Sequence, residues 1–162
     1  MQAPAYLIAY GLPGQLWIMP HPPTETLPDA VASYAARGID TVVSMLPTDD
    51  VVQLGLGDEA ALCTAQDIEF LNHPIVDFGL PDADTFPALT DGLATRIRAG
   101  RRVAVHCRAG VGRSGMATAC TLIRLGWDRD KAVRAVSEAR GVSIPDTVAQ
   151  AEYIAAFEQN PK

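Results

Sequence analysis

The segment 106–114, His-Cys-Arg-Ala-Gly-Val-Gly-Arg-Ser, is the feature that most constrains this chain. The mostly apolar run 102–105 before it predicts a buried β-strand, and residues 115–123 after it predict a helix, so the segment is expected at a strand-to-helix turn. Backbone N–H groups in such a turn can point toward one centre, and the positive end of the helix adds to their field. The segment therefore predicts a binding site for a tetrahedral oxyanion.

A thiol and a guanidinium stand at the two ends of this turn, at Cys107 and Arg113. Gly110 and Gly112 supply backbone angles with φ > 0, or a close approach, that a Cβ would resist. Arg113 offers a planar fork to two phosphate oxygens at once, a geometry that lysine lacks. The field of the turn favours the thiolate of Cys107, which is the nucleophilic form. Ser114 can donate a hydrogen bond to the sulfur and so help it leave in a later step.

The rest of the segment completes an anion site. His106 is interpreted as a hydrogen-bond donor that organises the loop, since a thiolate made by the loop needs no separate base. A buried, inert cysteine is the alternative interpretation of the segment, but it would not require the arginine, the glycines and the serine at these offsets. The residues expected to bind the phosphate are Arg108, Ala109, Gly110, Val111, Gly112 and Arg113.

The stretch 106–115 resembles the signature His-Cys-(x)5-Arg-Ser/Thr-Gly of the cysteine-dependent protein tyrosine phosphatases, including their compact dual-specificity branch. The resemblance implies a three-layer α/β fold with a central, mostly parallel sheet flanked by helices. It also implies removal of phosphate from phosphotyrosine, and from phosphoserine or phosphothreonine, through a cysteinyl-phosphate intermediate, with no metal and no cofactor. Low-molecular-weight phosphatases and arsenate reductases share the cysteine-to-arginine spacing, but their loop typically lies close to the N-terminus.

A phosphatase of this chemistry needs a proton donor for the leaving oxygen, usually a carboxylic acid on a movable loop. The segment 74–84 follows an apolar run, contains turn-forming glycine and proline, and carries Asp77 and Asp82. In the family the general acid precedes the nucleophile by the interval that separates Asp77 from Cys107. We therefore predict Asp77 as the general acid and keep Asp82 as the alternative.

A third segment, 140–150, is similar to the loop and helix start that many compact phosphatases place against the active site. In that resemblance Gln150 positions the hydrolytic water. The other interpretation is an exposed polar residue on the last helix, because glutamine is common on helix surfaces. Both interpretations of Gln150 are open at this point.

The composition predicts one compact enzyme domain over residues 1–162. Hydrophobic residues make up 48% of the chain, which is enough for a single core. With Lys+Arg 13 against Asp+Glu 19, the formal net charge of −6 argues against a general affinity for nucleic acid or anionic membrane. We expect no signal peptide and no membrane span. Arginine outnumbers lysine, a bias typical of GC-rich bacterial genomes.

The cysteine count is odd, and the spacing predicts neither a disulfide framework nor a metal site. Reduced thiols are typical of the cytoplasm, and we expect a cytoplasmic monomer. Cys63 and Cys120 lie in apolar helical surroundings and are interpreted as core residues. A protective disulfide from either of them to Cys107 is an open alternative, which geometry would have to allow.

The hydrophobic pattern predicts strands that alternate with helices, which is typical of an α/β fold. Strands are expected at 6–10, 15–19, 41–46, 69–76 and 102–105. Helices are expected at 27–37, 58–65 with Asp58 as cap, 86–97 with Asp84 as cap, from the loop to 125, at 128–140 and at 146–158. A site outside the carboxyl end of a central strand is where open α/β sheets bind ligands.

Two other classes of function are weighed against a phosphatase. A non-catalytic phosphate-binding module would bind without turnover, which the intact Cys107, Arg113 and Asp77 argue against. A thiol redox enzyme of the arsenate-reductase type would need a resolving cysteine near Cys107, and only Cys63 or Cys120 could serve.

The substrate is left open by the sequence. Arg108 adds positive charge inside the loop, as in many phosphoinositide phosphatases, or it is a solvated rim residue. The apolar Val111 and the acidic balance of the chain favour the second interpretation. The candidates are a phosphorylated protein, a phosphoinositide and a small phosphoester.

Overall fold

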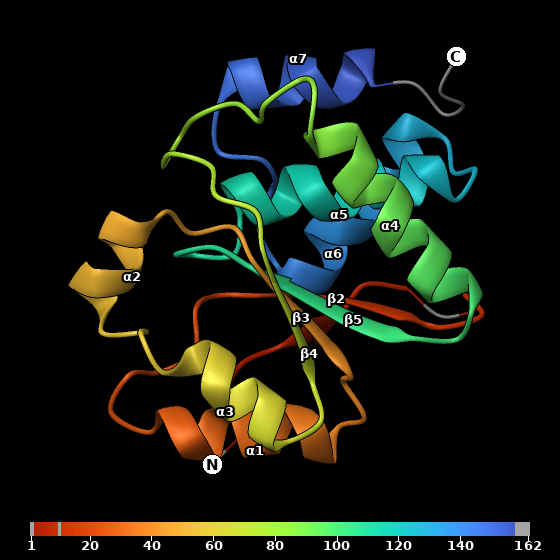
Figure 1. Cartoon of the computed structure of the whole chain (residues 1–162). Helices are drawn as coiled ribbons and strands as arrows, with labels where there is room; N and C mark the ends of the chain where they lie inside the picture. Colours follow the sequence, from red (N-terminus) through yellow and green to blue (C-terminus); the bar gives the residue numbers. More distant parts are fainter. Residues whose placement is uncertain (1, 10, 158–162) are drawn as a thin grey trace.

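The computed structural model describes residues 2–9 and 11–157, and the predicted element ends at Tyr10 and Glu158 lie outside this range. One five-stranded sheet, in the order β1-β2-β5-β3-β4, has helices on both faces (Figure 1). The strands are β1 (Tyr6–Leu7), β2 (Gln15–Met19), β3 (Thr41–Ser44), β4 (Glu69–Asn72) and β5 (Arg102–His106). The helices are α1 (Leu27–Ala36), α2 (Thr48–Leu54), α3 (Glu59–Ala65), α4 (Phe86–Arg98), α5 (Gly112–Arg124), α6 (Arg129–Arg140) and α7 (Val148–Ala156).

The sheet is parallel except for β1, which runs antiparallel to β2. β5 lies at its centre, where His106 pairs with Met19 of β2 on one side and with Ser44 of β3 on the other. The carboxyl ends of three strands therefore meet at one edge, and the loop after β5 leaves the sheet there. The predicted α/β class with a mostly parallel sheet is confirmed.

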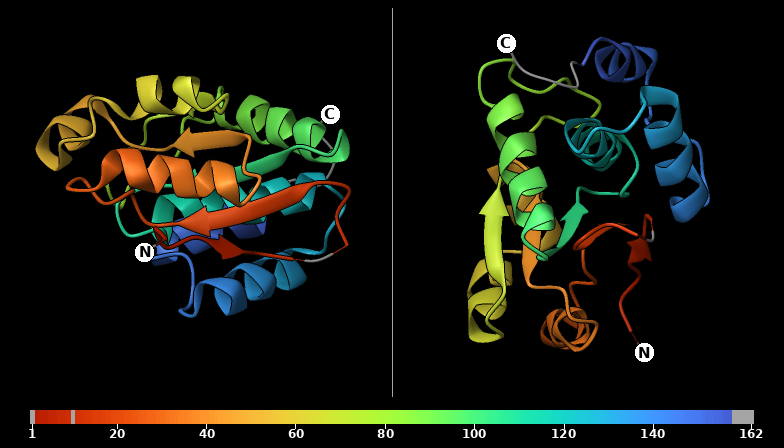
Figure 2. Two further views of the ribbon diagram at one scale, coloured as in Figure 1. Left: turned by 90° about the horizontal axis from the view of Figure 1, so that it is seen from below. Right: turned by 90° about the vertical axis from the view of Figure 1, so that its right-hand side faces the viewer.

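The helices form a layer on each face of the sheet (Figure 2). α1 and α3 lie together on one face, α4, α5 and α6 cover the other, and α7 packs against α5 from outside. Every residue of α5 is buried, because this helix lies between the sheet and three other helices. The start of α5 is therefore fixed by packing. No helix of the described residues is both long and apolar enough to cross a membrane.

β4 is shorter than the sequence pattern predicts. The predicted strand runs to Val76, but β4 ends at Asn72. Pro74 has no N–H to donate to a neighbouring strand, and the side-chain amide of Asn72 bonds to carbonyl oxygens at and beyond the end of β3, at 3.0 Å. The residues released in this way, 73–85, form a loop that carries Asp77, which we call the acid loop.

The helix caps agree with the sequence in part. Asp128, at which the sequence predicts a helix to begin, is the N-cap of α6 and accepts two backbone N–H groups at 3.1 and 3.2 Å. The prediction for Asp84 is wrong: Thr85 is the N-cap of α4, while the N–H of Asp84 donates to the carboxylate of Asp82 at 2.7 Å. Asp58 stands at the N-cap of α3, but its side chain accepts no capping bond.

Two features at the carboxyl edge of the sheet differ from the prediction. The helix α2 was not expected, because it is short and buries none of its residues, so it leaves little periodic signal. α7 begins at Val148 rather than at Asp146. The reason is a capping box, in which the Thr147 hydroxyl accepts the N–H of Gln150 at 3.1 Å and the amide oxygen of Gln150 accepts the N–H of Thr147 at 3.2 Å.

Candidate active site

The loop between β5 and α5, residues 107–111, accepts a hydrogen bond at each of its five backbone carbonyl groups, the last of them within the first turn of α5. We call it the nucleophile loop. His106 Nδ1 donates to the carbonyl of Cys107 at 3.1 Å, and the N–H of His21 donates to that of Arg108 at 3.1 Å. Arg140 donates from Nη2 to the carbonyl of Ala109 at 3.0 Å and from Nε to that of Gly110 at 3.2 Å. The N–H of Gly115 donates to the carbonyl of Val111 at 3.0 Å. In a trans peptide the N–H points opposite to the carbonyl, so carbonyls bonded outward leave the N–H groups facing inward. The nucleophile loop is therefore a preformed nest for an anion.

Two glycines stand where a side chain would not fit. Gly110 has φ +73°, and a Cβ there would collide with the backbone at Met19. Gly112 begins α5, where a Cβ would lie 2.5 Å from the carboxylate of Asp146 and 3.0 Å from the amide oxygen of Gln150. The first glycine provides a backbone angle and the second a close approach, so the start of α5 lies directly against Asp146 and Gln150.

The thiol and the hydroxyl of the predicted site are both buried. Cys107 directly follows β5 and is 3% exposed, with the N-terminal end of α5 at the other end of the same loop. The field of that helix end favours an anion within the loop. Ser114 lies in the first turn of α5, and its buried hydroxyl has no hydrogen-bond partner in the part of the chain that the structure describes. This hydroxyl is therefore available to a sulfur or to a ligand.

Arg113 is 1% exposed and is anchored by three acceptors. Its Nη1 donates to the carboxylate of Asp50 at 3.1 Å and to the carbonyl of Ile75 at 2.8 Å. Its Nη2 donates to the carboxylate of Asp77 at 3.0 Å. The guanidinium is thus fixed at the junction of the nucleophile loop, the acid loop and α2.

Asp50 of α2 is a site residue that the sequence did not reveal. Besides Arg113, it accepts a bond from Arg108 Nη2 at 3.1 Å, and Arg108 also donates to Gln53 at 2.7 Å. Burial opposes the ionisation of Asp50, but the bonds from Arg113 and Arg108 outweigh it and hold its pKa below the usual range. Asp50 therefore bridges the two arginines as a carboxylate.

Of the two candidate acids, the structure brings Asp77 to the site. Its carboxylate bonds Arg113 and also accepts the N–H of Phe78 at 3.1 Å, and its side chain is 39% exposed. Asp82 is exposed and accepts the N–H of Asp84 at the approach to α4. Asp77 thus lies beside the guanidinium expected to bind the phosphate and is also open to solvent.

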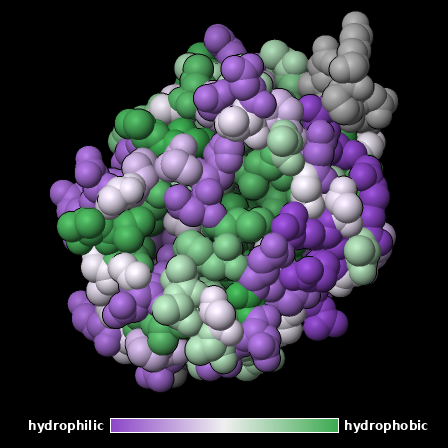
Figure 3. All heavy atoms as spheres, viewed as in Figure 1, coloured by the Kyte–Doolittle hydropathy of each residue, from purple (hydrophilic) through white to green (hydrophobic). Residues whose placement is uncertain are grey.

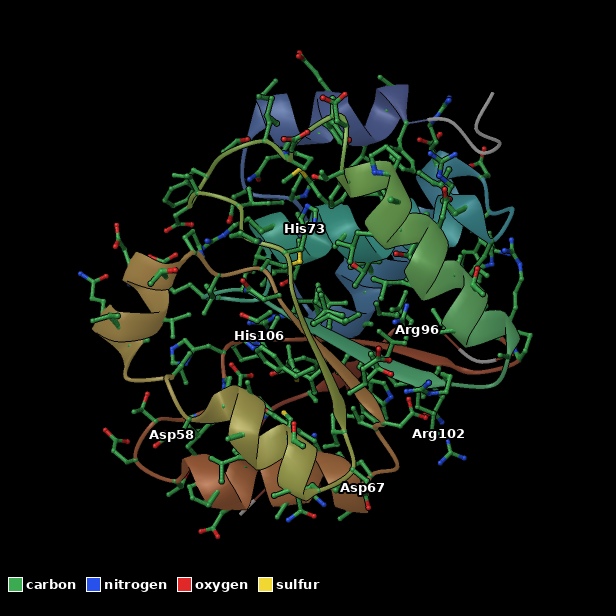
Figure 4. All side chains as sticks on the ribbon, viewed as in Figure 1. Asp58, Asp67, His73, Arg96, Arg102 and His106 are labelled. Atoms are coloured by element: carbon green, nitrogen blue, oxygen red, sulfur yellow. The ribbon has the colours of Figure 1, made fainter. Side chains whose placement is uncertain are left out.

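His106 is buried at the end of β5 (Figure 4). Both of its ring nitrogens are hydrogen-bonded. Nδ1 donates to the carbonyl of Cys107, and Nε2 lies 2.6 Å from the carboxylate of Glu59 in α3. Sequence reasoning missed Glu59. An acidic residue at the start of the otherwise apolar stretch 60–63 was the available signal, because a buried carboxylate requires a partner.

The other two cysteines have no such surroundings. All three cysteines are free, and Cys63 and Cys120 are fully buried. Burial, followed by the charge of Glu59, raises the pKa of the Cys63 thiol to about 12, and burial also raises the pKa of Cys120. Both are therefore neutral thiols near pH 7, unsuited to nucleophilic attack.

Gln150 is fully buried, so its interpretation as an exposed helix residue is wrong. Its Nε2 donates to the carbonyl of Gly79 in the acid loop at 3.1 Å. Its Oε1 accepts the N–H groups of Asp146 and Thr147 at 3.1 and 3.2 Å. Through these bonds and its approach to Gly112, Gln150 ties α7 to the acid loop and to the start of α5.

Arg140, at the C-terminal end of α6, is a further residue to which the sequence assigned no role. Its guanidinium donates to two carbonyls of the nucleophile loop and lies 4.9 Å from the centre of the Tyr6 ring. Arg140 therefore holds the outer side of the loop from another element of the fold.

The assembled groups suit phosphoryl transfer. A thiol lies in a nest of amides, a buried guanidinium stands beside it, and a carboxyl reaches the same guanidinium from a second loop. Among the residues that the structure describes, no three His, Cys, Asp or Glu side chains gather closely enough to hold a metal ion.

Comparison with known proteins agrees with this site. The family model "Polymorphic toxin system, DSP-PTPase phosphatase" matches residues 20–127, more than half of the chain. Cyclin-dependent kinase inhibitor 3 of Rattus norvegicus is 32% identical over 88 residues, which are 53% of this chain and 42% of that protein. The Homo sapiens protein is 31% identical over 88 residues. The chain thus aligns with less than half the length of these relatives.

Solved structures share the fold. Kinase associated phosphatase, with its catalytic-site cysteine replaced by serine, gives a TM-score of 0.85 at 19% identity, covering 97% of this chain and 94% of that chain. Tk-PTP in its active form gives 0.74 at 24% identity, covering 97% of both chains. The resemblance first found in the signature at 106–115 is confirmed, and the chain belongs to the DSP-PTPase phosphatase family, the compact dual-specificity-like branch of the cysteine-dependent phosphatases.

Proposed function

We propose that this chain hydrolyses phosphomonoesters on proteins, from phosphotyrosine and from phosphoserine or phosphothreonine, through a cysteinyl-phosphate on Cys107. The observation that carries the proposal is the nucleophile loop, whose five carbonyls are all hydrogen-bonded, so that its amides are free to bind an anion. The buried Arg113 beside it supplies the charge for a dianion. Membership in a phosphatase family supports the same conclusion.

In the first step the Cys107 thiolate attacks phosphorus in line with the leaving oxygen. The S–P bond forms, the ester P–O bond breaks, and Asp77 gives its proton to the leaving oxygen. The loop amides and Arg113 hold the three equatorial oxygens, where charge accumulates. A bound dianion takes the place of the Asp77 carboxylate at Arg113, which leaves the Asp77 side chain free to reach the leaving oxygen.

In the second step water attacks phosphorus and the S–P bond breaks. Asp77 takes the proton of the water, and the free hydroxyl of Ser114 donates to the departing sulfur. Gln150 orients the water, since its Nε2 has a second hydrogen beyond the one bonded to Gly79. Inorganic phosphate leaves, and the proton and electron balance of both steps requires no metal or cofactor.

Two residues act behind the reacting groups. His106, bonded to the Cys107 carbonyl and to Glu59, positions the first peptide of the nucleophile loop. The side chain of Arg108 faces Asp50 and Gln53, so its contribution to phosphate binding is the backbone amide. This pairing favours a protein substrate over a phosphoinositide, for which a free cation beside the phosphate site would be needed.

Hydrolysis of an aryl phosphate by chelator-treated protein tests the proposal. We expect release of inorganic phosphate and, after acid quenching, a peptide with one phosphoryl group on Cys107 in the mass spectrum. Cys107→Ser should give neither signal. Phosphate binding without turnover would instead assign the chain to the alternative class of non-catalytic binding modules.

We further propose that these residues act as a single catalytic domain, monomeric and cytoplasmic. The three free cysteines, all buried, fit a reducing compartment. Size-exclusion chromatography with light scattering measures the oligomeric state directly, and a stable dimer would contradict this part of the proposal.

A further inference from the structure

Large apolar side chains are exposed on two segments that border the nucleophile loop. Among the described residues, six large hydrophobic side chains are exposed, and five of them lie in the acid loop or in the segment from α6 to the first turn of α7. We call these five the apolar rim. They are Val76, Phe78, Leu80, Val142 and Val148. Figure 3 shows hydrophobic groups gathered at its upper left, over the acid loop and the start of α7.

Two hydrogen bonds of the acid loop, one at Asp77 and one at Gly79, place its rim residues near the site. Asp77, between Val76 and Phe78, bonds Arg113. The residue before Leu80 accepts a bond from Gln150. These three apolar side chains therefore stand beside the groups that receive the phosphate.

The other part of the rim is tied to the loop in the same way. Val142 lies two residues after Arg140, whose guanidinium donates to two carbonyls of the nucleophile loop. Val148 precedes Gln150, whose amide oxygen lies against Gly112. The two segments thus approach the loop from its α6 and α7 side.

The sixth exposed apolar side chain, Val52, has another orientation. Asp50 and Gln53 of α2 face the arginines of the site, and Val52 lies about 200° around the helix axis from Asp50. It is equally apolar and 75% exposed, but it does not border the loop. Val52 therefore provides a matched control.

The arginines near the rim are engaged in hydrogen bonds, whereas the exposed charged residues of the acid loop are aspartates. Arg108 bonds Asp50 and Gln53, and Arg140 bonds loop carbonyls. Asp82 and Asp84 are exposed in the acid loop beside the apolar side chains. An acidic group next to the phosphate being cleaved would meet these carboxylates, so the rim disfavours it.

We infer that the apolar rim selects the substrate by the residues that flank the phosphorylated one: large apolar side chains on both sides, and no acidic neighbour. The inference rests on the proposed function and deepens it. Because the phosphate must reach Cys107, the flanking residues lie across the rim and cover side chains such as Phe78, which is 64% exposed. The net charge of −6 and the nearby carboxylates argue against an anionic lipid surface as the occupant.

Three phosphotyrosine peptides of equal length test the inference, differing only in two residues flanking the phosphotyrosine: leucine, serine or aspartate. The readout is kcat/KM from released phosphate. We expect the leucine peptide to exceed the serine peptide by about tenfold, which a few methylene contacts can supply. The aspartate peptide should be the slowest. Equal values for the three peptides would overturn the inference.

Variants of the rim residues test whether the preference for leucine over serine beside the phosphotyrosine arises at the apolar rim. In Val142→Ser combined with Val148→Ser, the leucine-to-serine ratio should fall toward one, while Val52→Ser should keep the ratio of the unmodified protein. The ratio is taken within each variant, so a smaller folded fraction cancels. A ratio that falls equally in Val52→Ser would contradict the assignment to the rim.

A small aryl phosphate, which does not reach the rim, distinguishes a failure of the rim inference from a failure of the proposed phosphatase function. Turnover of this ester without preference among the peptides overturns the rim inference alone. Absence of turnover with every substrate overturns the proposed function and the inference with it. Binding to phospholipid vesicles that Phe78→Ser abolishes would assign the rim to a lipid surface and would likewise overturn a peptide occupant.

Discussion

The nucleophile loop and the acid loop meet at Arg113 but are held in different ways. The nucleophile loop has a bonded carbonyl at each of its five residues, a glycine at a position closed to side chains, and a buried helix behind it. The acid loop exposes three large apolar side chains and joins the site through Ile75, Asp77 and Gly79. One loop is fixed along its whole length, and the other is attached at a few points.

The difference corresponds to two chemical demands. Charge that develops on phosphate oxygens is stabilised best by donors already in place before the reaction. A proton donor must approach each substrate and withdraw from each product, which suits a loop with few buried contacts. Changes in the nucleophile loop should therefore slow all substrates alike, whereas changes in the acid loop should depend on the leaving group.

Cys107→Ser should produce the largest effect, because it removes the proposed nucleophile of both half-reactions. We expect kcat to fall by at least about 10⁴-fold for an activated aryl phosphate and for a phosphopeptide alike. Cys63→Ala is the control, since its thiol is neutral and buried, and its activity per folded molecule should persist. Retained turnover in Cys107→Ser would place the nucleophile elsewhere.

Asp77→Asn should lower kcat to different extents for different substrates, depending on their leaving groups. For an alkyl phosphate, whose leaving oxygen requires a proton, we expect a loss of about 10²–10⁴-fold. For an aryl phosphate with an acidic leaving group the loss should be much smaller, because that oxygen departs without protonation. The ratio of kcat values for the two esters is the measurement. Equal losses would show that Asp77 positions Arg113 rather than donating a proton, and a normal rate with both would move the role to Asp82.

The contrast also explains what the sequence could predict. The thiol, the glycines and the guanidinium lie within one short segment, and their chemistry restricts a strand-to-helix turn strongly enough to identify it. The interval between Asp77 and Cys107 matches the one that the resemblance to the phosphatase family implies for the general acid. These features are local or depend on spacing along the chain, so they can be found without coordinates.

The supports of the site are long-range and could not be found in this way. Asp50 reaches Arg113 from a helix with no buried residue, Glu59 reaches His106 from α3, and Arg140 reaches the loop carbonyls from α6. Each pair joins residues at least 30 positions apart. Only the packing of helices against the sheet brings them together, and a single sequence gives no periodic signal for such pairs.

Arg140→Met tests the pre-ordering of the nucleophile loop. The substitution keeps most of the apolar stem but removes the bonds to the carbonyls of Ala109 and Gly110, so two peptides lose their outward anchor. We expect kcat/KM to fall by about tenfold for both the alkyl and the aryl ester, since one or two weakened donors cost this order of magnitude or more. Arg134→Met, at an exposed position of the same helix, is the matched control. A loss confined to one ester would contradict the idea that the nucleophile loop acts on all substrates alike.

Asp50→Asn should have the smallest effect, and its pH dependence identifies the cause. The pKa of Asp50 is lower in the fold, because the bonds from Arg113 and Arg108 outweigh the cost of burial, so its carboxylate stabilises the fold above its unfolded pKa of about 4. That contribution is lost as the pH falls through the lowered value. We expect the variant to lose about 1–2 kcal/mol in its free energy of unfolding at pH 7, and the difference to narrow below about pH 4. Urea unfolding across this range measures it, with Asp49→Asn on the exposed side of α2 as control. If the difference in free energy of unfolding persisted in acid, Asp50 would act by packing rather than by its charge. The position of Arg113 would then depend on its bonds to Ile75 and Asp77. In that case the acid loop would hold the site more firmly than its few points of attachment indicate.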